Sequence, residues 1–275
     1  MTALLDPPRA TGAALPGWRA TLLVVEGLWT WYRRNWRATV ISSVLQPLLF
    51  LVAFGVGFGT LLDRGGRAQQ VIDVPYLVYL APALLAVGAI QNAAFESTYP
   101  VLSAFKWQRN YWGVSATPIT PGQLACGQLS WITLRLAGSG AAYLLVISLF
   151  GAARGPGIVA ALPLAVLCGM AFSAPVVAFA ATVENDGAAF NALFRFVVMP
   201  MTLFSGTFFP ISQLPEPVRP LAWISPLWHG TELTRGAALG VLELGPALGH
   251  TAYLAALVIA GVLLARWRFR ARLAR

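Results

Sequence analysis

Six long stretches of the chain hold at most one charged residue each. They lie at residues 38–62, 74–97, 123–153, 156–183, 187–209 and 244–266. A hydrocarbon core about 30 Å thick is crossed by about 20 mostly apolar residues in a helix, because a helix satisfies its own backbone hydrogen bonds in lipid. The sequence therefore predicts an all-α integral membrane protein, with a domain of six transmembrane helices over residues 38–266.

The shortage of charge supports this class. Charged residues make up only 11% of the 275 residues, against roughly 25% in soluble domains, which excludes a water-soluble globule. The formal net charge is +9. The basic residues lie in clusters between the apolar stretches, so they indicate membrane topology and not a nucleic-acid-binding face.

The distribution of basic residues predicts the orientation. With six spans, twelve Lys and Arg residues fall on the side of the two termini and five fall on the other side. Cytoplasmic loops are the ones enriched in Lys and Arg. We therefore expect a multi-pass protein of the bacterial cytoplasmic membrane, with both termini and the basic tail 267–275 in the cytoplasm.

The N-terminal segment 1–37 ends in an amphipathic pattern. Large apolar residues recur at steps of four and three, at Trp18, Leu22, Val25, Trp29, Tyr32 and Trp36. Charged residues fall on another side, at Arg19, Glu26, Arg33 and Arg37. This pattern predicts a cytoplasmic interfacial helix along the membrane surface. The alternative is a juxtamembrane anchor with no further task.

The segment 210–240 is apolar but broken by prolines. Residues 216–224 and 227–239 predict two helices, which at 1.5 Å per residue reach roughly 14 and 20 Å and are too short to span. Irregular backbone at membrane depth survives only against protein or a wet cavity. We therefore expect a re-entrant outer helical hairpin between the fifth and sixth spans.

The longest inner loop, 99–122, joins the second and third spans. It combines a short helix with exposed cations and aromatic rings, so Trp107, Arg109 and Tyr111 are candidate anchors for a soluble motor protein. The alternative is a solvated loop whose Trp residues belong to an interfacial belt.

Five charged residues fall at a similar depth near the inner ends of the spans. They are Glu96, Arg135, Glu184, Asp186 and Arg195. One hypothesis is that they exchange ion-pair partners between inward-open and outward-open states. The alternatives are fixed pairs that lock helices together and side chains that reach the lipid headgroups.

The sequence has no motif for chemistry of its own. It has no G-x-x-x-x-G-K-[ST], and its only lysine, Lys106, lies in FKWQRN. A P-loop cradle for phosphates needs that motif, so we expect ATP and Mg²⁺ to bind to a partner chain. The spacings of Cys126, Cys168, His229 and His250 match no metal or nucleophile motif, so we expect no cofactor, metal site or catalytic residue on this chain.

Three motifs carry a family resemblance. They are PYLVYLAPALLAVGAIQNAAFESTYP, ATPITPGQLACGQ and LFSGTFFPISQLPEPVRPLAWISPLWHGTELTRG. With six spans and an N-terminal surface helix, they resemble the ABC-2 type exporter permeases, also called type V exporters. The resemblance runs from about Trp18 to span six. It is closest to permeases that export lipo-oligosaccharide nodulation signals and to drug-resistance permeases of the daunorubicin type.

The resemblance implies a homodimer of two permease chains, surrounded by membrane lipid, above two copies of an ABC ATPase subunit. The residues it places against the ATPase are Trp29, Arg33, Lys106, Trp107, Arg109 and Tyr111. The outer hairpin would shape the exit path, with contacts to an amphiphile from Phe204, Phe208, Phe209, Trp223, Trp228 and His229. For His229 we favour an interfacial hydrogen bond over a proton relay.

The expected function is therefore the permease subunit of an ATP-driven exporter of a lipid-like, glycolipid or drug-like amphiphile. One alternative is an ion-gradient-driven transporter, which would carry ionisable groups near the bilayer midplane. The other is a membrane enzyme on lipid-linked sugars, for which Glu216, Glu232 and Glu243 are loose candidates on the outer side.

Overall fold

The computed structural model describes residues 16–58, 74–149, 151, 155, 157–185 and 187–274, and every regular element within these ranges is a helix. The elements, in chain order, are α1 (Gly17–Phe50), the π-helical η1 (Leu51–Phe58), α3 (Tyr76–Ser97), α4 (Tyr99–Lys106), α5 (Asn110–Ser115), α6 (Pro121–Leu149), α7 (Gly157–Ala180), α8 (Ala188–Leu193), the π-helical η2 (Phe194–Val198), α9 (Met199–Phe204), the short 3-10 turns η3 (Ile211–Gln213) and η4 (Glu216–Val218), α10 (Arg219–Ile224), α11 (Pro226–Leu239) and α12 (Leu244–Leu273).

Four helical stretches in the described part of the chain are long and apolar enough to cross a membrane. They are Tyr76–Lys106, Pro121–Leu149, Gly157–Ala180 and Leu244–Leu273. They correspond to the expected second, third, fourth and sixth spans. The described part of the chain thus has the all-helical architecture of a multi-pass membrane protein.

The expected first and fifth spans are not among these four stretches. Ala188–Phe204, formed by α8, η2 and α9, is a shorter apolar helix. Residues 38–58 of the expected first span fall in α1 and η1, and its expected last residues, 59–62, fall outside the described residues.

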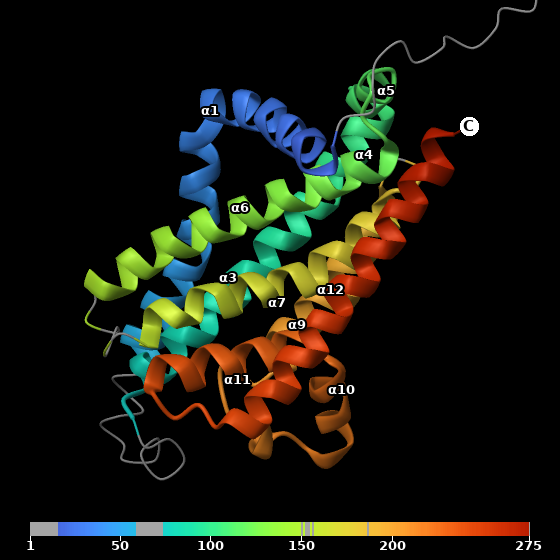
Figure 1. The fold of residues 1–275 in the computed structure, drawn as a ribbon. Coiled ribbons are helices and arrows are strands. Elements are labelled where there is room, and N and C mark those ends of the chain that lie inside the picture. The colour runs from blue at the N-terminus through green and yellow to red at the C-terminus, as the bar shows by residue number, and fades with distance from the viewer. Residues whose placement is uncertain are drawn as a thin grey trace, which may run out of the picture.

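Helix α1 contains parts of two elements that the sequence predicts as separate. The expected surface helix and the first half of the expected first span, residues 38–50, lie in one continuous helix from Gly17 to Phe50. Figure 1 shows its early turns running across the end of the bundle and its later turns descending beside the other long helices. No residue between the amphipathic and apolar segments breaks the helix, so the helix changes direction without ending.

Helix α3 forms the centre of the bundle. Most of its residues are buried, including an unbroken run from Val78 to Ile90. Helices α6, α7 and α11 pack against it. Without a hydrophobic driving force between helices in lipid, close packing depends on small residues. At Gly169 of α7, for example, an added Cβ would lie only 3.1 Å from the Ala89 carbonyl oxygen of α3.

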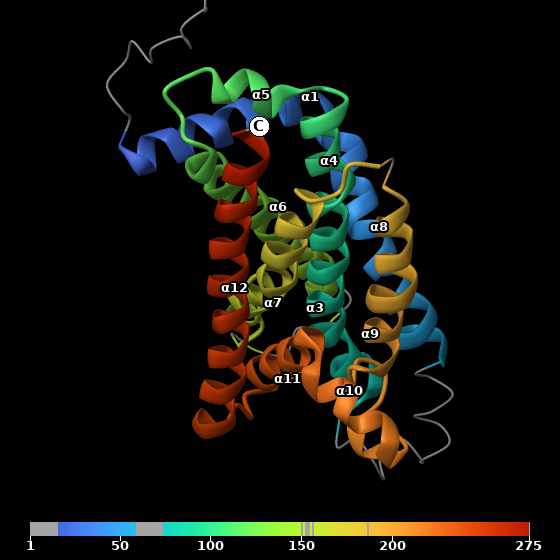
Figure 2. The ribbon, with the colours of Figure 1, turned by 90° about the vertical axis from the view of Figure 1, so that its right-hand side faces the viewer.

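The bundle has two distinct ends (Figure 2). Helices α4 and α5 lie at one end with the last turn of α12, and we call this the α5 end. Helices α10 and α11 lie at the opposite end, which we call the α10 end. Candidate functional residues gather at both ends.

Candidate functional site

The loop at the α5 end is held by a cluster of aromatic rings. The ring of Phe105 in α4 lies 4.7 Å from that of Tyr111 in α5 and 4.9 Å from that of Phe269 in α12. Trp112 donates a hydrogen bond from Nε1 to the Phe105 carbonyl oxygen at 3.1 Å. The neighbouring helices α4 and α5 are therefore packed into one unit with α12, which is distant in sequence.

Tyr111 lies inside this unit. Its side chain is only 4% exposed. The sequence instead predicts Tyr111 as an exposed anchor for a partner protein. Its hydroxyl donates to Gln128 Oε1 of α6 at 2.9 Å. Burial raises the pKa of the Tyr111 phenol, which keeps the hydroxyl protonated as a donor. Tyr111 thus attaches α5 to α6 and does not offer a surface to a partner.

We expect Tyr111→Phe to lower the free energy of unfolding by about 1 kcal/mol, because the buried Gln128 amide loses its partner. Reversible unfolding in mixed micelles measures this change. Tyr99→Phe is the matched control, since the Tyr99 hydroxyl makes only long contacts of 3.3 and 3.4 Å. An equal loss in both variants would contradict the assignment.

Arg272 attaches the last turn of α12 to the same unit. Its guanidinium carbon lies 4.3 Å from the centre of the Phe105 ring. Its Nη1 donates to the carbonyl oxygens of Ala180 and Ala181, at 3.3 and 3.0 Å, where α7 ends. A cation at the C-terminal end of a helix satisfies carbonyls that lack a partner within the helix. A displacement of α4 would therefore change the contacts that Arg272 of α12 makes with both α4 and α7.

Other predicted contact residues lie on the outside of the α5 end. Trp107 is 53% exposed, and Arg109, which begins α5 with a left-handed φ of 55°, is also exposed. Arg33 is exposed on α1, and Lys106 is partly exposed at the end of α4. Trp29 instead turns one ring edge toward α6, where its centroid lies 6.3 Å from that of Trp131.

Two members of the predicted inner charge set, Glu96 and Arg135, form an ion pair. Arg135 Nη2 of α6 lies 2.7 Å from Glu96 Oε1 of α3, and both side chains are largely buried. Glu184 and Arg195 lie at exposed positions, and Asp186 falls outside the described residues. Glu96 and Arg135 therefore form a bond between two long helices, α3 and α6.

The α10 end is organised around a buried arginine. Arg235 of α11 is 8% exposed, and its guanidinium carbon lies 3.8 Å from the centre of the Tyr79 ring in α3. Its Nη2 donates to the carbonyl oxygens of Gly206 and Thr207, at 2.9 and 3.3 Å. Arg235 thus holds together α3, α11 and the turn after α9.

Hydroxyl groups reinforce this turn. Tyr76 of α3 donates to the Phe208 carbonyl oxygen at 2.9 Å. The hydroxyls of Ser205 and Ser225 lie 2.6 Å apart, and Thr231 donates to the Ser205 carbonyl oxygen at 3.2 Å. The carbonyl oxygens of residues 205–208, directly after α9, therefore all accept hydrogen bonds from side chains of α3 or α11.

His229 joins α11 to α10 and α12. Its Nε2 lies 2.9 Å from the Trp223 carbonyl oxygen, which can only accept, so Nε2 carries the proton. In the neutral ring Nδ1 is then an acceptor, and it lies 2.7 Å from Nδ1 of His250 in α12. His229 is thus hydrogen-bonded at both ring nitrogens, and the choice between an interfacial hydrogen bond and a proton relay stays a prediction.

The predicted aromatic contacts fall into two groups. Phe204, Phe209 and Trp223 have exposed side chains at the α10 end. Phe208 packs its ring on those of Phe50 and Phe54, at 6.0 and 5.2 Å. Trp228 is partly buried, with its ring 5.0 Å from that of His250. The exposed three are available to a ligand, and the other two hold helices together.

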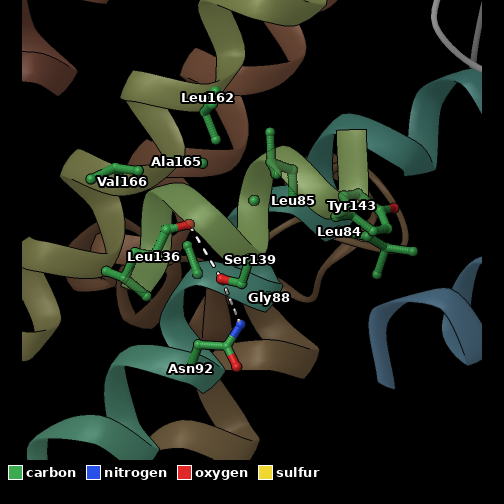
Figure 3. Close-up of a pocket in the computed structure, with 12 residues that line it drawn as sticks. Leu84, Leu85, Gly88, Asn92, Leu136, Ser139, Tyr143, Leu162, Ala165 and Val166 are labelled. Carbon is green, nitrogen blue, oxygen red and sulfur yellow. Dashed lines mark hydrogen bonds between the residues drawn. The ribbon is translucent and has the colours of Figure 1, made fainter. Parts of the chain in front are cut away.

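The cavity between α3, α6 and α7 is too small for a substrate. Its volume is about 10 Å³, room for about one water molecule. Figure 3 shows Asn92 of α3 and Ser139 of α6 pointing toward one another, and Asn92 Nδ2 donates to Ser139 Oγ at 3.3 Å. This cavity is a helix-packing feature.

Sequence reasoning missed the role of Arg235. Counting basic residues treats it as one exposed charge of an outer loop. A signal was present, because Arg235 continues the four-residue series of Leu227 and Thr231, both fully buried on α11. His250 lacks such a signal, because its partner His229 is brought near only by the packing of α11 on α12.

Comparison with known proteins supports the family resemblance seen in the sequence. The profile of the ABC-2 type transporter family matches residues 19–239. Nodulation protein J of Sinorhizobium fredii is 31% identical over 86% of this chain and 89% of the relative. Nodulation protein J of Bradyrhizobium diazoefficiens is 30% identical over 76% and 79%, and that of Rhizobium meliloti is 27% identical over 77% and 82%. The resemblance in the three motifs is confirmed, and the chain belongs to the ABC-2 type transporter family.

Proposed function

We propose that this chain is the transmembrane permease subunit of an ABC exporter, which moves an amphiphile across the cytoplasmic membrane with energy from a separate ATPase subunit. The observation that carries the proposal is the mechanical continuity of the α5 end. Exposed Trp107 and Arg109 lie on a loop whose buried ring, Tyr111, is bonded to α6 and packed on α12. A movement of the loop would therefore act on α6 and α12 through the contacts of Tyr111.

The transport step then follows from two packings of the helices. Nucleotide-driven movement of the ATPase pushes on α4 and α5 and changes the relative populations of inward-open and outward-open arrangements. Such a shift needs contacts that differ between the two states. The Glu96–Arg135 pair is one contact that joins separate spanning helices, and it is the candidate for exchange.

The proposed topology has six spans with both termini in the cytoplasm. The α5 end faces the cytoplasm, and the α10 end faces outward with α10 and α11 as a re-entrant hairpin. The carbonyl bonds made by Arg235 and Tyr76 support this placement, because they satisfy the irregular backbone between α9 and α10 without water.

The proposed assembly is a homodimer of permease chains on two copies of an ABC ATPase, which bind ATP and Mg²⁺. Membership of the ABC-2 family supports an ATPase partner. The similarity to nodulation protein J and the resemblance of the three motifs to lipo-oligosaccharide exporters support a lipo-oligosaccharide or related glycolipid as the cargo.

We expect Trp107→Ala combined with Arg109→Ala to lower ATP-driven transport about tenfold, since exposed Trp and Arg anchors each contribute 1 kcal/mol or more to an interface. Transport of a fluorescent glycolipid into proteoliposomes that contain the permease and its ATPase measures this. Trp267→Ala with Arg268→Ala, an exposed Trp and a partly buried Arg on α12 outside the α4–α5 loop, is the control. Unchanged transport in the first variant would refute the coupling role of the α4–α5 loop.

A further inference from the structure

A second and larger cavity lies where α1 crosses α6. Its volume is about 250 Å³, and one water molecule occupies about 30 Å³ of liquid. The cavity therefore has room for several waters or for one small polar headgroup. Trp29 and Tyr32 of α1 line one side, and Trp131, Arg135 and Ser139 of α6 line the other.

Three aromatic rings form the walls of this cavity. The Tyr32 and Trp131 centroids are 5.4 Å apart with the planes at 71°, and those of Trp29 and Trp131 are 6.3 Å apart at 69°. In an edge-to-face pair the edge of one ring meets the face of the other, so the pair does not cover all of its ring surface. Trp131 is only 6% exposed, so the uncovered surface is mainly that of Trp29. Trp29 is 52% exposed, so the cavity has an open side.

The polar groups of the cavity carry no net charge. Arg135 places its guanidinium carbon 4.3 Å from the centre of the Tyr32 ring, and its Nη2 is paired with Glu96 at 2.7 Å. The guanidinium has five N–H donors, and the described residues show one of them bonded to a side chain. The cavity therefore offers hydrogen-bond donors together with a compensated charge.

We propose that this cavity binds the saccharide headgroup of an amphiphile that enters from the inner leaflet. Sugar rings have apolar C–H faces, which stack on aromatic rings, and hydroxyl groups, which accept from guanidinium donors. An anionic headgroup would favour an unpaired cation, and a quaternary ammonium would favour an unpaired carboxylate. The Glu96–Arg135 pair provides neither.

The position of the cavity fits entry from the membrane. Trp131 lies ten residues along α6 from Pro121, which is about 15 Å from the α5 end of that helix. A headgroup can therefore occupy the cavity while the acyl chain of the same molecule remains in the lipid. The inference rests on the proposed function, because it assigns the α5 end to the cytoplasmic side.

Binding of a defined glycolipid tests the proposal. The purified chain is placed in phosphatidylcholine nanodiscs and titrated with radiolabelled dodecyl maltotrioside, and with dodecyl phosphate as a probe of equal chain length. We expect saturable binding of the maltotrioside, and a roughly tenfold higher Kd in Trp29→Leu, since an aromatic contact contributes up to about 1.5 kcal/mol. Trp31→Leu is the control, because Trp31 is on the same helix, 63% exposed and outside the cavity.

A second variant tests the charge argument. Glu96→Gln leaves the Arg135 cation uncompensated, so we expect the affinity for dodecyl phosphate to rise relative to that for the maltotrioside. Tighter binding of dodecyl phosphate than of the maltotrioside by the unsubstituted chain would overturn the proposal in favour of an anion site. So would equal Kd values for Trp29→Leu and Trp31→Leu, or no saturable binding of the sugar in the presence of phosphatidylcholine.

The proposal and the proposed function fail separately. Sugar binding that depends on Trp29, in a complex with its ATPase that shows no ATP-driven transport, would leave the site standing and remove the exporter. ATP-driven glycolipid transport by a chain whose sugar binding is unchanged by Trp29→Leu would support the exporter and remove the site.

Discussion

Replacing Arg235 by methionine is expected to lower the free energy of unfolding by about 3 kcal/mol. The substitution removes a guanidinium that donates to the carbonyl oxygens of Gly206 and Thr207. Hydrogen bonds from a charged donor contribute about 1.5–3 kcal/mol, and the buried acceptors left behind lose their partner. Reversible unfolding in mixed micelles is the measurement.

The matched control is Arg219→Met in the same hairpin. The Arg219 guanidinium also bonds two carbonyl oxygens, those of Leu214 and Ser212 at 3.1 and 2.9 Å. Arg219 is only partly buried, however, so water can replace its bonds. We expect less than half of the Arg235 effect. Equal losses from the two variants would mean that Arg235 does not hold the α10 end together.

The second large effect is expected at Gly261, where α12 crosses α7. A Cβ at this position would lie 2.6 Å from the backbone nitrogen of Pro175 and 2.7 Å from the carbonyl carbon of Ala174. Backbone atoms within a helix cannot move aside as a flexible side chain can. We therefore expect Gly261→Leu to push α12 away from α7 and to lower the free energy of unfolding by about 2–3 kcal/mol.

Gly249→Leu on the same helix serves as its control. A Cβ at Gly249 would meet nothing within 4 Å, so this variant adds the same side chain with no collision. We expect its free energy of unfolding to remain within about 0.5 kcal/mol of the unsubstituted chain. If Gly261→Leu were equally well tolerated, close contact between α12 and α7 would not be what stabilises this pair of helices.

The long helices could be predicted because one local property determines them. Apolar stretches of sufficient length must be helical in lipid, and α3, α6, α7 and α12 follow from counting uncharged residues. The continuity of α1 could not be predicted in this way. A change from a Trp- and Arg-rich segment to an apolar one changes the environment of a helix without giving it an end.

The candidate site depends on contacts between distant segments, which periodicity does not encode. In the sequence, Tyr111 resembles an exposed aromatic residue of a loop. It is buried because Phe269 lies beside it after folding. Glu96 and Arg135 were recognised as charges at a similar depth, but their pairing depends on how α3 packs on α6. Arg235 is buried because the turn after α9 presents carbonyl oxygens to it.

The central claim is that this chain conducts an amphiphile and has no energy source of its own. It is tested most directly by measuring ATP hydrolysis and glycolipid transport in proteoliposomes that contain either the chain alone or the chain with its ABC ATPase. The account predicts no hydrolysis and no transport by the chain alone, and ATP-dependent transport by the two together. ATP hydrolysis by the purified chain without a partner would contradict it.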